Sequence, residues 1–215
     1  NFGFSVSAMV KSKDEVGTLA LAFDSMVSGL AERDKVKGLL NKFHGSSVAE
    51  DLISNDAATK KGIRKPVVIF FSDIRSFTAT SEAMEPEDVV SMLNEYFQIM
   101  VGIVIENNGI VDKFIGDAVM AVWGAPQSTG DDIYHALNAS LQMRIALEKL
   151  NINREARGEA PLMIGMGLHF GDALSGTIGS DERMEYTVIG DTVNTAARVE
   201  ASTKSFGTDL LVTEE

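Results

Sequence analysis

The sequence contains no cysteine, one tryptophan and four prolines, and it has far fewer basic than acidic residues. The lack of cysteine excludes a disulfide scaffold, a cysteine nucleophile and a cysteine-ligated zinc site. The chain has 19 Lys and Arg residues against 31 Asp and Glu residues, which gives a formal net charge of −12 at pH 7. Because a nucleic-acid backbone requires a basic surface, the sequence predicts no nucleic-acid partner. A polyphosphate substrate would need cations at its binding site.

Long apolar runs are absent as well. Without a stretch of about 18 apolar residues we expect no membrane-spanning helix in this sequence, and no signal peptide is visible. Hydrophobic residues nevertheless make up 45% of the 215 residues, which is typical of a globular protein. This length suits one catalytic domain with an accessory segment.

A candidate hairpin lies in the middle of the chain. Two apolar runs, Ile110–Ile115 and Ala118–Trp123, flank the pair Gly116-Asp117. A two-residue loop that begins with glycine is typical of a hairpin with a type II′ turn. The sequence therefore predicts that Asp117 lies at the hairpin tip, where it could also be a simple turn-forming residue.

A second acidic residue lies at a predicted strand end. Residues 67–71 are continuously apolar, as expected of a strand buried on both faces, and Asp73 follows them. Asp73 could cap the next helix. Two strand-end acids in one domain favour a divalent-metal site instead, because Mg²⁺ is commonly held by one or two carboxylates together with substrate phosphates.

The N-terminal region predicts a helix with one apolar seam. Its apolar residues recur at alternating steps of three and four, the pattern of a parallel coiled coil. They are Val16, Leu19, Phe23, Met26 and Leu30. An amphipathic helix packed on its own domain is the alternative. Beyond Leu30 the repeat shortens by one position, as in a stammer, and residues 54–65 are polar and aperiodic, as in a linker.

The rest of the chain shows alternating helix and strand patterns. We expect helices at residues 89–105, beginning near Pro86, then from Asp131-Asp132 to about Leu150, and at residues 192–204. We expect strands at residues 163–170, 173–178, Met184–Ile189 and 208–212. The second of these strands is predicted to lie antiparallel to the first.

Three features of this region need a separate interpretation. Gly165, Gly167 and Gly171 lack the spacing of a dinucleotide fingerprint, and no helix follows them. His169 lies inside a predicted strand and is interpreted as a core or hydrogen-bonding histidine. Asp191 precedes a predicted helix, which we expect it to cap rather than to bind metal.

Three blocks of the sequence resemble the signature motifs of class III nucleotidyl cyclases. They are FFSDIRSFT, DKFIGDAVMAVWG and YTVIGDTVNTAAR, and they occur in this order within residues 66–215. Among these enzymes the chain is similar to bacterial adenylate cyclases. The resemblance implies an α+β catalytic domain with a ferredoxin-like βααββαβ core. Relatives normally continue into two more strands that carry a phosphate-binding lysine, and we expect these strands to be missing here.

The stretch DEVGTLALAFDSMVSGL resembles the second helix of a HAMP signal-relay domain. This resemblance implies that residues 1–33 are the connector and second helix of a HAMP domain and that residues 34–65 form a transducer helix and linker. The parent protein is then expected to be a receptor of the plasma (inner) membrane, anchored by segments absent from this sequence. Its catalytic portion would be cytoplasmic, and this fragment itself soluble.

The cyclase resemblance also implies a set of site residues. Asp73, Asp117 and the carbonyl of Ile74 would bind two divalent ions, Mg²⁺ or Mn²⁺, and the amides around Phe77 and Thr78 would hold phosphates. On the helix at residues 192–204, Asn194 would orient the ribose and Arg198 would stabilise charge on the transferred phosphate. The spacing of four places these last two on one helix face, where they could also be an ordinary surface pair.

Base choice can be argued from atoms. Adenine offers an acceptor at N1 and a donor at N6, whereas guanine offers the reverse. Lys113 has only donors and Thr187 can accept, so this pair suits adenine. By resemblance, adenylate-forming relatives carry Lys with Asp, Thr or Ser at these positions, and guanylate-forming relatives carry Glu and Cys. Alternatively, Lys113 could be a surface lysine that pairs with Asp117.

Together these features predict an adenylate cyclase that converts ATP to 3′,5′-cyclic AMP and pyrophosphate. The resemblance implies a head-to-tail homodimer with two shared sites, in which one chain supplies the metal-binding acids. The other chain would supply Lys113, Thr187, Asn194 and Arg198. The alternatives are an inert cyclase-homology module, which the intact site residues oppose, and a guanylate cyclase, which Lys113 opposes. A diguanylate cyclase lacks support because its Gly-Gly-Asp/Glu-Glu-Phe signature is absent.

Overall fold

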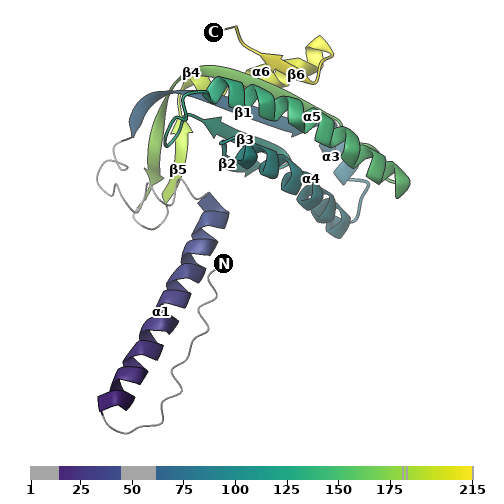
Figure 1. The fold of residues 1–215 in the computed structure, drawn as a ribbon. Coiled ribbons are helices and arrows are strands. Elements are labelled where there is room, and N and C mark those ends of the chain that lie inside the picture. Colours follow the sequence, from purple (N-terminus) through teal and green to yellow (C-terminus); the bar gives the residue numbers. More distant parts are fainter. Residues whose placement is uncertain (1–14, 45–61, 181, 183, 215) are drawn as a thin grey trace. The chain divides into compact units, whose positions relative to one another are not determined.

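The computed structural model describes residues 15–44, 62–180, 182 and 184–214, which belong to two compact units, Asn1–Glu50 and Asp51–Glu215. The described part of the first unit is one helix, α1 (Glu15–His44) (Figure 1). The five residues of its predicted seam are between 39% and 70% exposed. The helix continues through the predicted stammer, but the stammer's side chains lie outside the described part. The predicted connector and residues 54–61 of the predicted linker also lie outside it.

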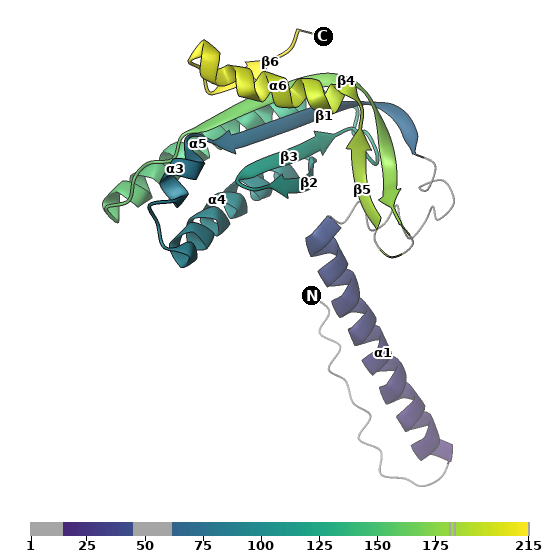
Figure 2. The ribbon, with the colours of Figure 1, turned by 180° about the vertical axis from the view of Figure 1, so that it is seen from behind.

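The second unit is built on an antiparallel sheet in the order β2-β3-β1-β4-β5, and a short β6 pairs in parallel with β4 (Figures 1 and 2). The strands are β1 (Ile63–Ile74), β2 (Ile110–Ile115), β3 (Ala118–Trp123), β4 (Ile164–Gly179), β5 (Met184–Ile189) and β6 (Leu210–Val212). The helices are α3 (Phe77–Ser81), α4 (Pro86–Glu106), α5 (Asp132–Ala156) and α6 (Asp191–Phe206). The predicted α+β, βααββαβ order is confirmed in β1, α3, α4, β2, β3, α5 and β4.

Helices cover both faces of the sheet. Helices α4 and α5 pack on one face, against Val68 and Phe70 of β1, and α6 packs on the other, against Val67, Ile69 and Phe71 (Figures 1 and 2). Alternate side chains of a strand point to opposite faces. The continuous apolar run at residues 67–71 is therefore explained by burial on both sides.

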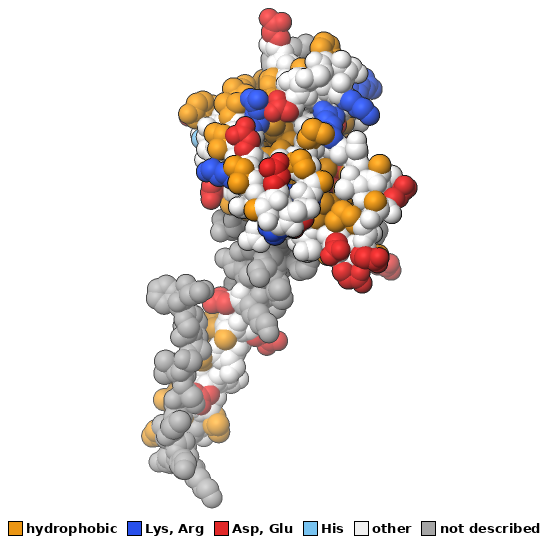
Figure 3. All heavy atoms as spheres, turned by 90° about the vertical axis from the view of Figure 1, so that its right-hand side faces the viewer, with side chains coloured by type: hydrophobic (Ala, Val, Ile, Leu, Met, Phe, Trp, Pro, Cys, Tyr) orange, Lys and Arg blue, Asp and Glu red, His pale blue; other side chains and the backbone are white. Residues whose placement is uncertain are grey.

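Helix α4 is long and apolar enough to cross a membrane by length and composition alone. Its inner side carries Tyr96 and Met100, which have no exposed surface and belong to the core on the sheet. We interpret α4 as the core helix of the domain. On the face of the molecule shown in Figure 3, some acidic side chains of the second unit stand among apolar and basic ones, and others gather at its lower right edge.

The prediction of two antiparallel strands at residues 163–170 and 173–178 is wrong. These residues form the single strand β4, which pairs with β1 from Ile74 opposite Ile164 to Ile63 opposite Ser175. The pair Gly171-Asp172 resembles a turn but lies within this ladder. A long neighbouring strand can keep the ladder continuous through such a pair, since the paired residues on either side of it hold the two strands together.

The glycines of β4 admit helix α6. A Cβ atom at Gly167 would lie 2.3 Å from the backbone nitrogen of Glu200, and one at Gly165 would lie 2.4 Å from its Oε1. These glycines therefore permit close approach of helix and sheet, in agreement with their exclusion as a dinucleotide motif. The buried His169 shares a hydrogen bond of 2.8 Å between its Nδ1 and Thr213 Oγ1, which confirms it as a hydrogen-bonding histidine.

Three expected boundaries differ from the structure. Strand β1 begins at Ile63, so residues 63–65 are part of the sheet rather than the linker. Helix α5 continues past Leu150 to Ala156, and its last turns include the buried Arg154, which donates from Nε to the Ala160 carbonyl at 2.9 Å. The prediction that Asp191 caps α6 is wrong: Gly190 is the N-cap, no side chain caps the helix, and Asp191 adds negative charge to its first turn.

Candidate active site

The two predicted metal-binding acids meet at one edge of the domain. Asp73 is next to last in β1, and Asp117 follows Gly116 in the two-residue turn between β2 and β3. Gly116 has φ 65° and Asp117 has no positive φ, as a type II′ turn requires. The Asp117 Oδ2 accepts a hydrogen bond of 3.0 Å from the Ile74 backbone N–H. This bond holds the hairpin tip against the end of β1.

The electrostatics of this edge favour a cation. Burial and the adjoining Asp73 carboxyl raise the pKa of Asp117 to about 7. Two carboxyl groups in such proximity repel each other when both are ionised, and a divalent ion between them would remove that cost. Among the described residues no group of three or more His, Asp or Glu side chains could hold a metal. The donor set therefore fits an ion held by two carboxylates, with positions left for substrate phosphates.

The acidic edge rests on a buried hydroxyl pair. Ser72 Oγ and the Tyr96 hydroxyl share a hydrogen bond of 3.2 Å, and neither residue is exposed. Burial raises the pKa of Tyr96, and the charges of Asp117 and Asp73 raise it further. The phenol therefore stays neutral behind the carboxylates.

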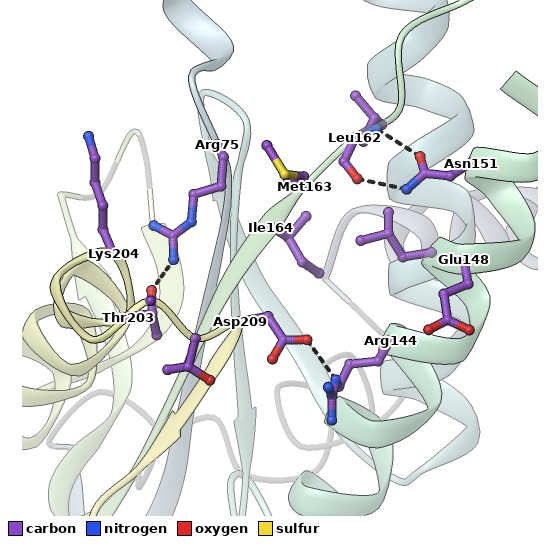
Figure 4. A pocket seen from close by; sticks show the side chains of 13 residues that line it. Arg75, Arg144, Glu148, Asn151, Leu162, Met163, Ile164, Thr203, Lys204 and Asp209 are labelled. Carbon is purple, nitrogen blue, oxygen red and sulfur yellow. Dashed lines mark hydrogen bonds and ion pairs between the residues drawn. The ribbon is translucent and has the colours of Figure 1, made fainter. Parts of the chain in front are cut away.

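Arg75 connects the end of β1 to α6, a contact that sequence reasoning missed. Its Nη1 lies 3.6 Å from Glu200 Oε1, and its Nη2 donates to Thr203 Oγ1. Burial, followed by the charge of Asp73, raises the pKa of Glu200, and Arg75 opposes this rise. Figure 4 shows Arg75 and Thr203 at one side of a cavity of about 460 Å³, with the Arg144–Asp209 pair (2.6 Å) opposite. This cavity contains none of the predicted site residues.

The predicted phosphate-binding segment follows Arg75 directly in the sequence. Ser76 has φ 57° and precedes α3, in which Phe77 packs against the core and Thr78 is exposed. The amides of a first helical turn have no partner within the helix. The role of these amides stays a prediction.

The predicted base-reading residues lie on the two edge strands and share a partner. Thr187 of β5 donates from Oγ1 to Asp112 Oδ2 of β2 at 2.9 Å, and Lys113 Nζ lies 3.4 Å from the same oxygen. Lys113 Nζ also lies 3.6 Å from Glu185 Oε2. The alternative in which Lys113 pairs with Asp117 is therefore wrong. Asp112 and Glu185 were missed, although Asp112 adjoins Lys113 within the motif DKFIGD.

A bulge explains how both neighbours on β2 reach β5. Val111 pairs with Ala121 and Lys113 pairs with Met120, so Asp112 is the extra residue of a β-bulge. Bulges redirect side chains and bend the strand. Asp112 and Lys113 thus contact β5 together, although a regular strand would send them to opposite faces.

Asn194 and Arg198 lie on the exposed side of α6, as their spacing predicts. Within the described part of the chain, neither side chain hydrogen-bonds to the acidic edge or to the base-reading pair. A single chain thus forms the acidic edge and, separately, the base-reading pair with Asp112. The two residues of α6 are exposed.

A known protein family matches most of this chain. Residues 60–214 match the model of the adenylate and guanylate cyclase catalytic domain family. An adenylate cyclase from Anabaena cylindrica is 36% identical over 213 residues, which cover 94% of this chain and 41% of that protein. The chain thus spans about two fifths of that relative.

Solved structures agree with this result. The adenylyl cyclase CyaB from P. aeruginosa is 36% identical with a TM-score of 0.66, over 72% of this chain and 79% of that chain. The guanylyl cyclase Cya2 is 39% identical with a TM-score of 0.63, over 65% of this chain and 71% of that chain. The chain therefore belongs to the adenylate and guanylate cyclase catalytic domain family.

Proposed function

We propose that this cyclase domain is an adenylate cyclase that converts ATP to 3′,5′-cyclic AMP and pyrophosphate. The observation that carries the proposal is the junction of Lys113 and Thr187 at Asp112. The lysine offers only donors, which suits adenine N1 and conflicts with the N1–H of guanine. The threonine oxygen can accept from the adenine N6 amine.

The reaction joins the ribose 3′ oxygen to the α-phosphorus as pyrophosphate leaves. Charge develops on the attacking and leaving oxygens, so positioning and electrostatics supply most of the catalysis. Asp73, Asp117 and the Ile74 carbonyl would hold two Mg²⁺ or Mn²⁺ ions. Such ions lower the pKa of a bound hydroxyl and neutralise phosphate charge.

The remaining residues would act on the ribose and the phosphates. Asn194 would orient the ribose by hydrogen bonding. Arg198 would place its guanidinium fork on the transferred phosphate, where two parallel donors match two phosphate oxygens. The first-turn amides at Phe77 and Thr78 would donate hydrogen bonds to the phosphate oxygens.

A head-to-tail homodimer would join these groups into two equivalent sites. Its support is the separation seen within one chain, where Lys113 pairs with Asp112 and Glu185 and where Asn194 and Arg198 face outward. Two-fold symmetry would bring the acids of one chain to the base-reading residues of the other. ATP would bind between the two chains.

The exposed seam of α1 supports a matching proposal for regulation. We infer that this helix pairs with α1 of the second chain in a parallel coiled coil of the HAMP type, which would relay a signal to the catalytic domains. The longer parent protein would be anchored in the plasma membrane, with its catalytic domain in the cytoplasm.

Incubation of the purified protein with ATP or GTP, in the presence of Mn²⁺ or Mg²⁺, tests the proposal. Chromatography of the nucleotides should show cyclic AMP from ATP, little cyclic GMP from GTP, and no product after metal removal with EDTA. A faster conversion of GTP would make the protein a guanylate cyclase. No product from either nucleotide would favour the inert signalling module.

A further inference from the structure

We infer that Asp112 is a specificity-determining residue that fixes the direction of the Thr187 hydroxyl, so that Thr187 can only accept a hydrogen bond from the base. The inference rests on the proposed function and deepens it. Thr187 and Lys113 are the residues that would touch the base. Asp112 acts through them and is a positioning residue.

The first step is the hydrogen bond itself. A hydroxyl has one hydrogen, and the Thr187 hydroxyl donates its hydrogen to Asp112 Oδ2 at 2.9 Å. An ionised carboxylate has no hydrogen to return. The remaining capacity of Thr187 Oγ1 is therefore two lone pairs, which match the N6 amine of adenine and oppose the O6 carbonyl of guanine. A threonine without this partner could turn its hydrogen toward O6 and accept either base.

The second step is the set of groups around Asp112. Its side chain is only 5% exposed, and burial, the largest effect, raises its pKa. The hydrogen bond from Thr187, the charge of Lys113 and a hydrogen bond from the Val188 backbone act against this rise. The Lys113 ammonium and the Val188 N–H can only donate, so the carboxyl group of Asp112 is placed as the shared acceptor of these donors.

The third step is that Thr187 depends on this oxygen more than Lys113 does. Asp112 Oδ2 accepts from Thr187 and lies 3.4 Å from Lys113 Nζ. Lys113 Nζ also lies 3.6 Å from Glu185 Oε2, so it keeps a carboxylate partner when Asp112 is replaced, whereas the Thr187 hydroxyl loses the acceptor that directs it. Thr187 retains 8% of its surface exposed, so access to its oxygen is narrow and its direction matters.

The experiment compares ATP with inosine triphosphate, which differs from it at N1 and at position 6 of the base. We would measure kcat/KM for both with Mn²⁺ in the wild type, in the single variants Asp112→Asn, Asp112→Ala and Thr187→Val, in the double variants that combine each Asp112 change with Thr187→Val, and in one control. Asparagine keeps the size of the side chain and replaces one acceptor oxygen with a donor NH₂. Of the three donors around it, only the Thr187 hydroxyl can reverse and accept.

We expect the ATP-to-inosine-triphosphate ratio to fall on the order of tenfold in both Asp112 variants, the usual scale for one hydrogen bond lost or mismatched at a buried site. In a Thr187→Val background, the change at Asp112 should no longer alter the ratio, since no hydroxyl remains to be directed. Glu185→Gln is the matched control. It removes the other carboxylate near Lys113 and leaves Asp112 and Thr187 in the sequence unchanged, so the ratio should keep its wild-type value.

The possible failures are distinguishable. If Thr187→Val leaves the ratio unchanged, the proposed base-reading role of Thr187 fails. If Thr187→Val lowers the ratio but both Asp112 variants keep the wild-type ratio while folded by circular dichroism, the role of Asp112 alone is overturned. A fall that persists in the Thr187→Val background would also overturn it, because Asp112 would then act by another route.

Discussion

The β2–β3 hairpin carries residues of both proposed sites: Asp117 of the metal site at its tip, and Lys113 of the base-reading pair near the middle of β2. The tip and the middle differ in how their charges are balanced. At its tip, Asp117 faces Asp73, and the raised pKa of Asp117 reports burial and a carboxyl neighbour. Near its middle, Asp112 faces Lys113 and Thr187 and is matched by donors from the same chain. The tip holds two adjacent carboxyl groups, which the proposed metal ion would neutralise, whereas the carboxyl group near the middle has donors from the same chain.

This difference teaches how one hairpin can serve two purposes. A site that binds metal keeps negative charge that no group of the folded chain neutralises. A bound cation neutralises this charge and thereby stabilises the folded state. A site that must read a base keeps its polar groups in fixed directions, because a preorganised donor or acceptor discriminates between partners. Replacing the acid at the tip and replacing the acid near the middle should therefore change the stability of the metal-free protein in opposite directions.

The largest expected effect is on activity at the tip. Asp117→Asn keeps an acceptor for the Ile74 N–H but removes a charge from the metal site. We expect cyclic AMP formation to fall about a thousandfold or more, since metal-assisted charge stabilisation is worth several kcal/mol. Initial rates with Mn²⁺ and saturating ATP measure this. Asp209→Asn, which affects only the distant pair with Arg144, is the control, and near-normal activity of Asp117→Asn would contradict the metal assignment.

The second prediction tests whether the tip of one chain works with the middle of the other. Asp73→Ala and Lys113→Ala should each be inactive, and their mixture should recover about a quarter of full activity after random re-pairing, because half the dimers are mixed and each has one intact site. Asp73→Ala mixed with Asp117→Ala should stay inactive. Recovery of the second mixture without the first would exclude shared sites.

The third prediction concerns stability and pH. Because the folded-state pKa of Asp117 lies near 7, above its usual value of 3.8, folding favours its protonated form. This contribution is present at low pH and is lost as pH rises through about 7, so the metal-free protein should become less stable between pH 4 and pH 7. Thermal unfolding in EDTA should show this slope, and Asp117→Asn should reduce it. A wild-type slope in the variant would assign the titration to another group.

The smallest expected effect is on stability at the middle of the hairpin. Asp112→Ala leaves the Thr187 hydroxyl and the Val188 amide short of an acceptor, which should cost about 1–3 kcal/mol of unfolding free energy. Urea denaturation at pH 7.5 in EDTA measures it. Under the same conditions Asp117→Asn should be neutral or stabilising. If both variants lost the same unfolding free energy, the proposed difference in charge balance between the tip and the middle of the hairpin would be wrong.

The sequence predicted the residues at the tip and near the middle of the hairpin unequally well. Asp73, Asp117, Lys113 and Thr187 each lie in a short motif whose local pattern places them at a strand end or on a strand, so local pattern and resemblance sufficed. The role of Asp112 could not be read in this way. It depends on a bulge and on a hydrogen bond to a residue 75 positions away.

One error in the predicted fold has a related cause. Gly171-Asp172 resembles a turn, but its place in β4 is decided by pairing with the twelve residues of β1. Tertiary pairing overrode local propensity at this position. The error at the end of α5 is different, because the Arg154 side chain there bonds to the Ala160 carbonyl only six residues away.

The most direct test of the central claim is the nucleotide preference of a double variant, Lys113→Glu with Thr187→Cys. These changes remove the donor for adenine N1 and the acceptor for its N6 amine, at a cost of about 1–3 kcal/mol for each contact. The measurement is kcat/KM for ATP and for GTP in wild type and variant. We predict that the wild type prefers ATP and that the folded variant loses most of this preference. An unchanged ATP preference in the folded variant would contradict the account.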